Sequence, residues 1–252
     1  MKLLFLGNSS TFSQDSRDHR TGSLSHLLSD QLGTPVEITA REIWPDARLP
    51  AFTDRLISRE QPDIVYFNIT DYAIAYPSTA VRLRRFGRIG RWAANRSLLF
   101  ADSQASHNAP VRAVRWLLQA TLGGEPHVPV DEGIQNFLET IRAAARHEAA
   151  FVMVDGPRAM GQYGATGRQN RIAEATRLRL HHALRDTCAS LHIHYTGYDT
   201  PIWADPTSPL HHTHDEFGGD GIHLNETAAQ RHDRIHANAI AAAYREHLAP
   251  RG

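Results

Sequence analysis

Short apolar runs alternate with helical patterns along the chain, and this alternation constrains the fold more than any other feature. Strands are predicted at residues 2–6, 36–39, 64–67, 150–154 and 191–195. Helices are predicted at residues 21–32, 111–122, 134–147, 168–190 and 226–248, where apolar residues recur at helical spacing. Strands that alternate with helices imply a parallel sheet covered on both faces. We therefore expect residues 1–252 to form a single α/β domain, a three-layer α/β/α sandwich with a central parallel sheet of about five strands.

A parallel sheet of this kind binds ligands beyond the carboxyl ends of its strands, so residues just after each strand are candidates for a site. The first strand runs into Gly7-Asn8-Ser9, and Gly7 allows a tight turn there. Ser9 would then be presented at the sheet edge as a nucleophile. The alternative is that Ser9 caps the following helix.

A second polar motif lies near the other end of the chain. Asp220 stands three residues before His223, just ahead of the last predicted helix. At that spacing the carboxylate can accept the imidazole Nδ1–H, which leaves Nε2 to act as a general base. A serine hydroxyl is a weak nucleophile until such a base takes its proton. The alternative is a solvated loop in which Asn225 caps the helix.

These two motifs together resemble the SGNH (GDSL-like) hydrolase superfamily. The likeness lies in a G-[DN]-S turn after the first strand and a D-G-x-H-x-N motif before the last helix, here Asp220 to Asn225. The resemblance implies a flavodoxin-like fold, with Ser9 as nucleophile, His223 as base and Asp220 as the residue that orients it. The family usually has Asp where this chain has Asn8.

The resemblance also implies an oxyanion hole with three donors: the N–H of Ser9, a Gly N–H after the second strand and an Asn side chain after the third. Asn68 directly follows the third strand and takes the Asn role, with Thr70 as a rival. The alternative for Asn68 is a turn-forming residue. The expected Gly is absent, so a backbone N–H of Trp44 or Asp46 is the substitute.

The composition of the chain indicates no particular class of binding partner. The formal net charge is zero, and nothing in the overall balance asks for a nucleic acid or an acidic surface. No apolar run reaches the length of about 20 residues that a membrane span needs. The lone Cys188 forms no intrachain disulfide and is expected in the core, which fits a cytoplasmic protein. We expect a small-molecule ester as substrate and no cofactor or metal, and the sequence leaves the oligomeric state open.

Two further clusters have more than one interpretation. The stretch Arg82–Arg91 carries five arginines, which form either a solvated helix face or a surface that attracts an anionic substrate or interface. Histidines gather before the last helix and on it; they are His211, His212, His214, His232 and His236. No metalloprotease pattern accompanies them. They are predicted as polar loop and helix-surface residues, some of them lining the cleft.

The sequence therefore predicts a serine esterase, in which Ser9 attacks an ester carbonyl while His223 takes its proton. Two alternatives remain open. One is an acyltransferase with the same triad, and the other is a non-catalytic binding protein on this fold, which the missing Gly favours. Neither the acyl group nor the alcohol of the substrate follows from the sequence.

Overall fold

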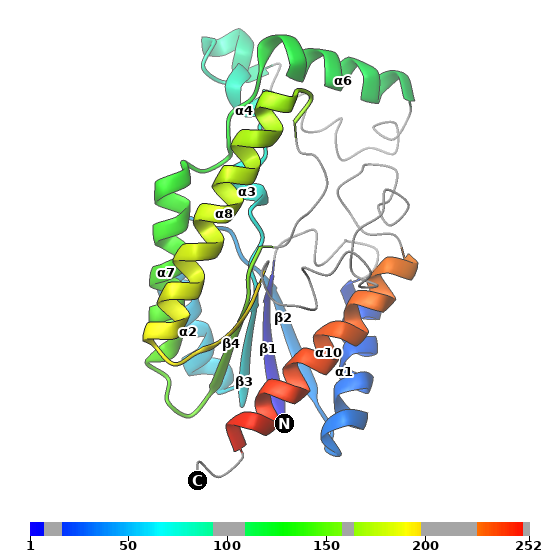
Figure 1. Ribbon diagram of the computed structural model, residues 1–252, viewed down its shortest axis with the longest axis vertical. Helices are drawn as coiled ribbons and strands as arrows, with labels where there is room; N and C mark the ends of the chain where they lie inside the picture. The colour runs from blue at the N-terminus through cyan, green and yellow to red at the C-terminus, as the bar shows by residue number, and fades with distance from the viewer. Residues whose placement is uncertain (8–16, 93–108, 158–163, 198–225, 249–252) are drawn as a thin grey trace.

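A computed structural model describes residues 1–7, 17–92, 109–157, 164–197 and 226–248 (Figure 1). Within these ranges five parallel strands form one sheet in the order β2-β1-β3-β4-β5. The strands are β1 (Lys2–Gly7), β2 (Glu37–Glu42), β3 (Ile64–Asn68), β4 (Phe151–Asp155) and β5 (His194–Thr196). The predicted three-layer α/β/α architecture is confirmed.

Side chains alternate between the two faces of the sheet and build a separate apolar core on each. On β3, Val65 and Phe67 join the core under α2 (Leu49–Glu60), α7 (Val130–Ala145) and α8 (Gly167–Ser190). Ile64 and Tyr66 join the opposite core, under α1 (Arg17–Leu32) and α10 (Glu226–Leu248). Because both faces are covered, β3 is buried along its whole length and its sequence is a continuous apolar run up to Asn68.

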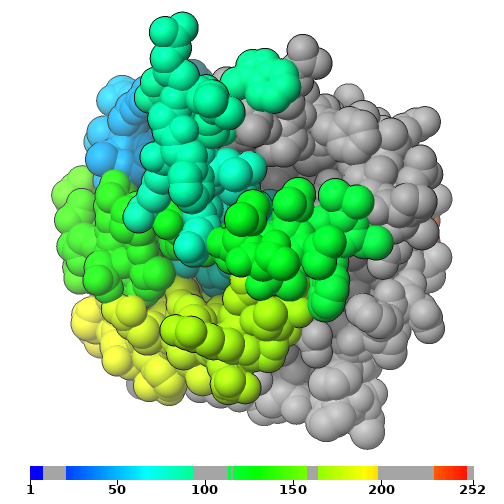
Figure 2. Space-filling model, turned by 90° about the horizontal axis from the view of Figure 1, so that it is seen from above, coloured from blue at the N-terminus to red at the C-terminus, as the bar shows by residue number. Residues whose placement is uncertain are grey.

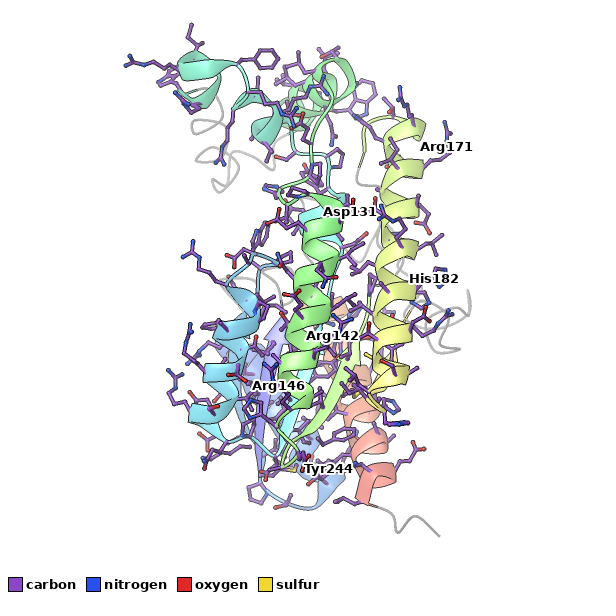
Figure 3. All side chains as sticks on the ribbon, turned by 90° about the vertical axis from the view of Figure 1, so that its left-hand side faces the viewer. Asp131, Arg142, Arg146, Arg171, His182 and Tyr244 are labelled. Atoms are coloured by element: carbon purple, nitrogen blue, oxygen red, sulfur yellow. The ribbon has the colours of Figure 1, made fainter. Side chains whose placement is uncertain are left out.

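Figure 3 shows the face where α7 and α8 run side by side across the sheet. α8 begins with a capping box, in which the Thr166 hydroxyl accepts from the Gln169 N–H and the Gln169 side chain accepts from the Thr166 N–H. Cys188 on α8 is fully buried, as predicted, and burial raises the pKa of its thiol to about 12. The thiol is therefore an inert part of the core.

The connection from β3 to β4 is long and helical. It holds α3 (Tyr72–Ala75), α4 (Thr79–Leu83) and α6 (Ala109–Leu122) before α7 begins. Figure 1 shows α4 and α6 at the end of the molecule beyond the carboxyl ends of the strands, and the C-terminus at the other end. No helix in the described ranges is both long enough and apolar enough to cross a membrane.

The structure differs from the sequence prediction at two elements. The sequence prediction missed α2, although Leu49, Thr53, Leu56 and Ile57 form a buried stripe at helical spacing behind Pro50. The predicted fifth strand, residues 191–195, begins too early, because Leu191 and His192 form the turn that ends α8. His192 has a left-handed backbone there, with φ 56°, and β5 starts only at His194.

Candidate functional site

Three polar side chains form a hydrogen-bonded row along the carboxyl edge of the sheet. Asn68 at the end of β3 pairs in register with Asp155 at the end of β4, and Asp155 pairs with Thr196 at the end of β5. The Asn68 amide donates to Asp155 Oδ2 at 2.9 Å, and the Thr196 hydroxyl donates to Oδ1 at 3.0 Å. All three residues are buried, so the row is a fixed part of the edge.

Asp155 accepts a third hydrogen bond from Tyr66, which lies on β3. The Tyr66 hydroxyl donates to Oδ2 at 3.0 Å and also lies 2.5 Å from Nδ1 of His236 on α10. A hydroxyl has a single hydrogen, so Nδ1 of His236 must carry its own and donate it to the Tyr66 oxygen. The chain His236–Tyr66–Asp155–Asn68 thus ties α10 to the candidate site.

Asp155 also decides which way the Asn68 amide points. A carboxylate only accepts hydrogen bonds, so the amide nitrogen, not the amide oxygen, must face Asp155. An amide nitrogen has two hydrogens, and Asp155 takes one of them. Asn68 is therefore held as a donor of fixed orientation, which is the property that an oxyanion hole requires.

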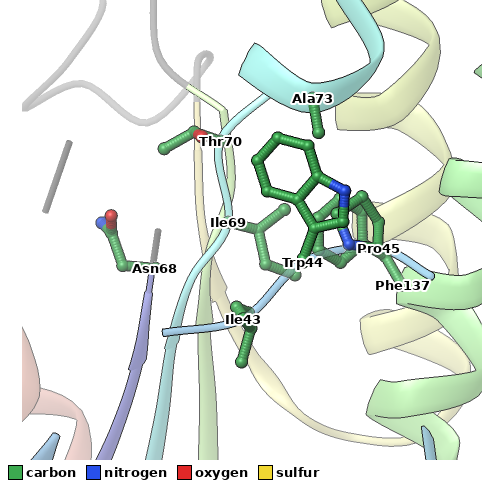
Figure 4. Close-up of a pocket in the computed structure, with 8 residues that line it drawn as sticks. All are labelled: Ile43, Trp44, Pro45, Asn68, Ile69, Thr70, Ala73 and Phe137. Carbon is green, nitrogen blue, oxygen red and sulfur yellow. The ribbon is translucent and has the colours of Figure 1, made fainter. Parts of the chain in front are cut away.

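Thr70 remains a rival of Asn68, because both line the same small pocket (Figure 4). The pocket encloses about 250 Å³ of empty space, part of it open to solvent. In the close-up, Asn68 and Thr70 point to one side of the chain and Ile69 to the other, as alternation requires. The direction of the side chains alone does not separate the two candidates, whereas the bond to Asp155 distinguishes Asn68.

The backbone after β2 narrows the choice of a second donor. The Ile43 N–H donates to the Gly7 carbonyl at 2.7 Å, which holds this segment against the end of β1. The Asp46 N–H is committed to the Trp44 carbonyl, also at 2.7 Å. Of the two substitutes for the missing Gly, Trp44 is therefore favoured, and Trp44 also lines the pocket with Asn68.

An aromatic cluster flanks the pocket at Trp44. The His127 ring stacks on Tyr72 with centroids 5.8 Å apart and meets Trp44 edge-on at 5.6 Å, while Tyr72 stacks on Tyr76 at 4.9 Å. Burial, and then the charge of Arg84, lower the pKa of His127. Its buried Nε2 has no hydrogen-bond partner among the described residues, so protonation of this ring is disfavoured.

Asp71 occupies a structural position. Its carboxylate accepts from Arg177 Nε at 2.9 Å in a fully buried ion pair, and Arg177 also bonds Glu174 at 2.6 Å. This pair ties the start of α3 to α8. Removing one partner would leave a buried charge uncompensated, so Asp71 fixes the chain just after Asn68 and Thr70.

Ser9, Asp220 and His223 lie outside the described residues, as do His211, His212 and His214. The structure does describe the elements beside the triad motifs. β1 ends at Gly7, two residues before Ser9, and α10 begins at Glu226, three residues after His223. Figure 1 shows α10 running antiparallel to the strands, so it begins at the carboxyl-edge end of the molecule.

His232 and His236 correct one prediction. Both were expected on the helix surface, yet only 5% and 3% of their areas are exposed. His236 packs against the rings of Phe5 and Tyr66, and the His232 ring lies beside that of His236. In the described ranges, no three His, Cys, Asp or Glu side chains are grouped so as to hold a metal ion.

The sequence prediction gave no role to Asp155, Tyr66 or Thr196, and it placed His236 with the polar loop and helix-surface residues without pairing it to Tyr66. Asp155 carried a usable signal, because it directly follows the strand predicted at residues 150–154 and is the last residue of β4 in the structure. Tyr66 and His236 carried none. A tyrosine within an apolar strand and a histidine on a helix become partners only when α10 packs on the sheet.

The fold is similar to that of several solved enzymes. An acetyl xylan esterase aligns with TM-score 0.53 and 13% identity, over 96% of this chain and 99% of its own. The lipase/acylhydrolase from Enterococcus faecalis aligns with TM-score 0.53 and 11% identity, over 96% and 95%. A gut microbial diltiazem-metabolizing enzyme aligns with TM-score 0.54 and 14% identity, over 94% of this chain but only 46% of that protein.

At these identities the likeness shows a shared fold, and it confirms the fold that the resemblance to SGNH hydrolases implied. No family model and no curated protein matches the sequence.

Proposed function

We propose that this chain is an SGNH-type serine hydrolase that cleaves carboxylic esters, with Ser9, His223 and Asp220 as its triad. One observation carries the proposal: a donor of fixed orientation, the Asn68 amide held by Asp155, stands at the carboxyl edge of a sheet with this fold. Ser9 lies two residues beyond the end of the neighbouring strand β1. Residues 1–252 are proposed to act as one domain.

The reaction is acyl transfer to water. Ser9 Oγ attacks the ester carbonyl as His223 Nε2 takes its proton, and Asp220 stabilises the imidazolium. The N–H of Ser9, the Asn68 amide and the N–H of Trp44 donate to the oxyanion. His223 then protonates the leaving alcohol, and the acyl-enzyme is hydrolysed when His223 activates a water molecule.

The proposed substrates are acetyl or other short acyl esters of sugars or small molecules. The acetyl xylan esterase that shares the fold along its whole length supports this choice. The transfer of the acyl group to an alcohol by the same triad is the alternative reaction. Incubation with p-nitrophenyl acetate in the presence of an acceptor alcohol distinguishes hydrolysis, alcoholysis and the absence of catalysis by their products.

The nucleophile is tested by Ser9→Ala. We expect this variant to lose p-nitrophenyl acetate hydrolysis and labelling by a fluorophosphonate, because no other group forms the acyl-enzyme. Circular dichroism should match that of the unmodified chain. Ser10→Ala is the matched control and should retain both activity and label. If Ser10 carries the label, or if the unmodified chain is neither labelled nor active, the proposal is wrong.

A further inference from the structure

The zero net charge of the chain conceals a marked asymmetry between two parts. Residues 79–92 and 109–124, which we call the cap segment, contain seven arginines and no acidic residue, and therefore carry a net charge of +7. The rest of the chain carries a net charge of −7. Such a division indicates that the cap segment faces a partner of opposite charge.

The described part of the cap segment also exposes large apolar side chains. They are Phe86, Ile89, Trp92, Val114, Trp116, Leu117, Leu118 and Leu122. Ile89 is 82% exposed and Leu117 is 55% exposed. Soluble monomers rarely gather so much apolar surface in one place unless it meets another surface.

On α6 the exposure is systematic. Val114, Leu117, Leu118 and Leu122 recur at helical spacing, so they form one stripe, and every member is exposed. The buried side of the helix carries Gln119, whose amide donates to the Pro77 carbonyl at 2.9 Å. α6 thus turns its apolar stripe to solvent and a polar residue to the protein, the reverse of a helix that covers a core.

Exposed arginines lie in the same segment as Phe86, Ile89 and Trp92. Arg82, Arg84, Arg85, Arg88 and Arg91 are all exposed. Arg85 is paired with Glu125 at 2.7 Å, just beyond the cap segment. Figure 2, which views the molecule from above, shows residues 79–92 and α6 on the same face. Exposed apolar side chains interspersed with arginines fit an interface that is apolar inside and anionic outside.

We propose that the cap segment binds the surface of an anionic lipid bilayer, with Ile89, Trp92 and the α6 stripe entering the headgroup region and the arginines contacting lipid phosphates. A nucleic acid would suit the arginines but not the apolar stripe. A second copy of the same face would bring its exposed arginines against arginines of the same charge. Because α4 and α6 lie at the carboxyl-edge end of the molecule, this docking turns the candidate site toward the lipid (Figure 1).

Cosedimentation of the full chain with vesicles tests the proposal without any need for catalysis. One set of vesicles is phosphatidylcholine alone, and the other is equal parts phosphatidylcholine and phosphatidylglycerol. We expect binding to the anionic set only, and weaker binding as the salt rises from about 0.1 M to about 1 M, where the screening length falls to about 3 Å. Failure to bind anionic vesicles would overturn the proposal whether or not the chain is an esterase.

Two double variants separate the contributions of the arginines and of the apolar stripe to vesicle binding. Arg88→Gln with Arg91→Gln, and Leu117→Ser with Leu118→Ser, should each lower the partition coefficient roughly tenfold or more. The matched controls are Arg146→Gln and Leu248→Ser, which change exposed residues at the opposite end of the molecule and should bind as the unmodified chain does (Figures 1 and 3).

Thermal unfolding should be the same for all four, because every changed side chain is exposed. Equal losses in the variants and the controls, binding to duplex DNA in place of vesicles, or a dimer in sedimentation that Leu117→Ser with Leu118→Ser abolishes, would each contradict lipid docking.

Discussion

The carboxyl edge of the sheet and the cap segment treat polar and apolar groups in opposite ways. At the edge, Asp155 is buried and accepts from three side chains, and apolar cores lie on both sides of the strands. In the cap segment, the Arg88 charge and the Leu117 side chain both face solvent. The edge satisfies its polar groups internally, whereas the cap segment exposes these two side chains to solvent.

This difference indicates different functions for the two regions. A buried hydrogen-bonded network fixes the orientation of its members, which suits chemistry that depends on donors being in place beforehand. Exposure of the apolar stripe of α6 to water is unfavourable, and burial of the stripe against a partner surface would lower the free energy. Changes at the edge should therefore alter the rate of reaction, and changes in the cap segment should alter only where the chain binds.

The largest expected effect that sharpens this comparison is on the triad. Asp220→Asn should lower kcat on p-nitrophenyl acetate by about 10⁴, because the His223 tautomer is no longer fixed. Arg88→Gln with Arg91→Gln should leave that kcat unchanged, since the substrate is soluble and small. Steady-state kinetics of both proteins measure the contrast. A loss below about tenfold in the Asp220 variant would remove that residue from the triad.

Asn68 comes next. Asn68→Ala should lower kcat by about 10²–10³ with little change in KM, because the donated bond forms mainly in the transition state. Thr70→Ala is the matched control in the same pocket and should lower kcat much less. The reverse ranking would move the oxyanion role to Thr70, and a large rise in KM alone would make Asn68 a substrate-binding residue.

Substitutions in the two regions should also differ in their effect on the free energy of unfolding. Leu180 on α8 is fully buried, so Leu180→Ala should lower the free energy of unfolding by about 2–5 kcal/mol. Leu117→Ala deletes the same atoms from the exposed stripe of α6 and should change it by less than about 0.5 kcal/mol. Urea denaturation measures both. A large loss at Leu117 would show that the cap segment has a buried core there and would break the comparison.

The smallest effect concerns His127, which lies where the two regions meet. Its pKa in the folded chain is below the ordinary value of 6.5, so the unfolded chain takes up a proton first as the pH falls. Above pH 6.5 the neutral His127 ring contributes its full stabilisation of the folded chain. This stabilisation is lost as the pH falls from 6.5 toward the pKa of His127 in the folded chain.

His127→Phe keeps a ring that does not titrate, so its free energy of unfolding should fall less between neutral pH and pH about 5. His194, whose pKa burial also lowers, is still present in the variant and should leave a residual slope. Urea denaturation at a series of pH values compares the two proteins. Parallel pH profiles would show that His127 does not titrate differently on folding.

The sequence pattern predicted most of the body correctly, since its buried strands are short apolar runs and apolar residues recur at helical spacing in its long helices. The helix at residues 168–190 differs from α8 by one residue at its start. The helix at residues 111–122 was also predicted, but its exposure was not, because an apolar stripe looks the same whether it faces a core or water. α2 was not predicted, although its buried residues recur at helical spacing in the sequence.

By itself the sequence determined the three-layer fold, the candidate triad of Ser9, Asp220 and His223, and the placing of Asn68 at a strand end. Only the tertiary structure decided what holds Asn68 and where the stripe of α6 points. Asp155 and Asn68 are 87 residues apart in the chain and become partners because parallel pairing brings the ends of β3 and β4 into register. Local pattern fixes which residues share a face, but only packing decides what that face meets.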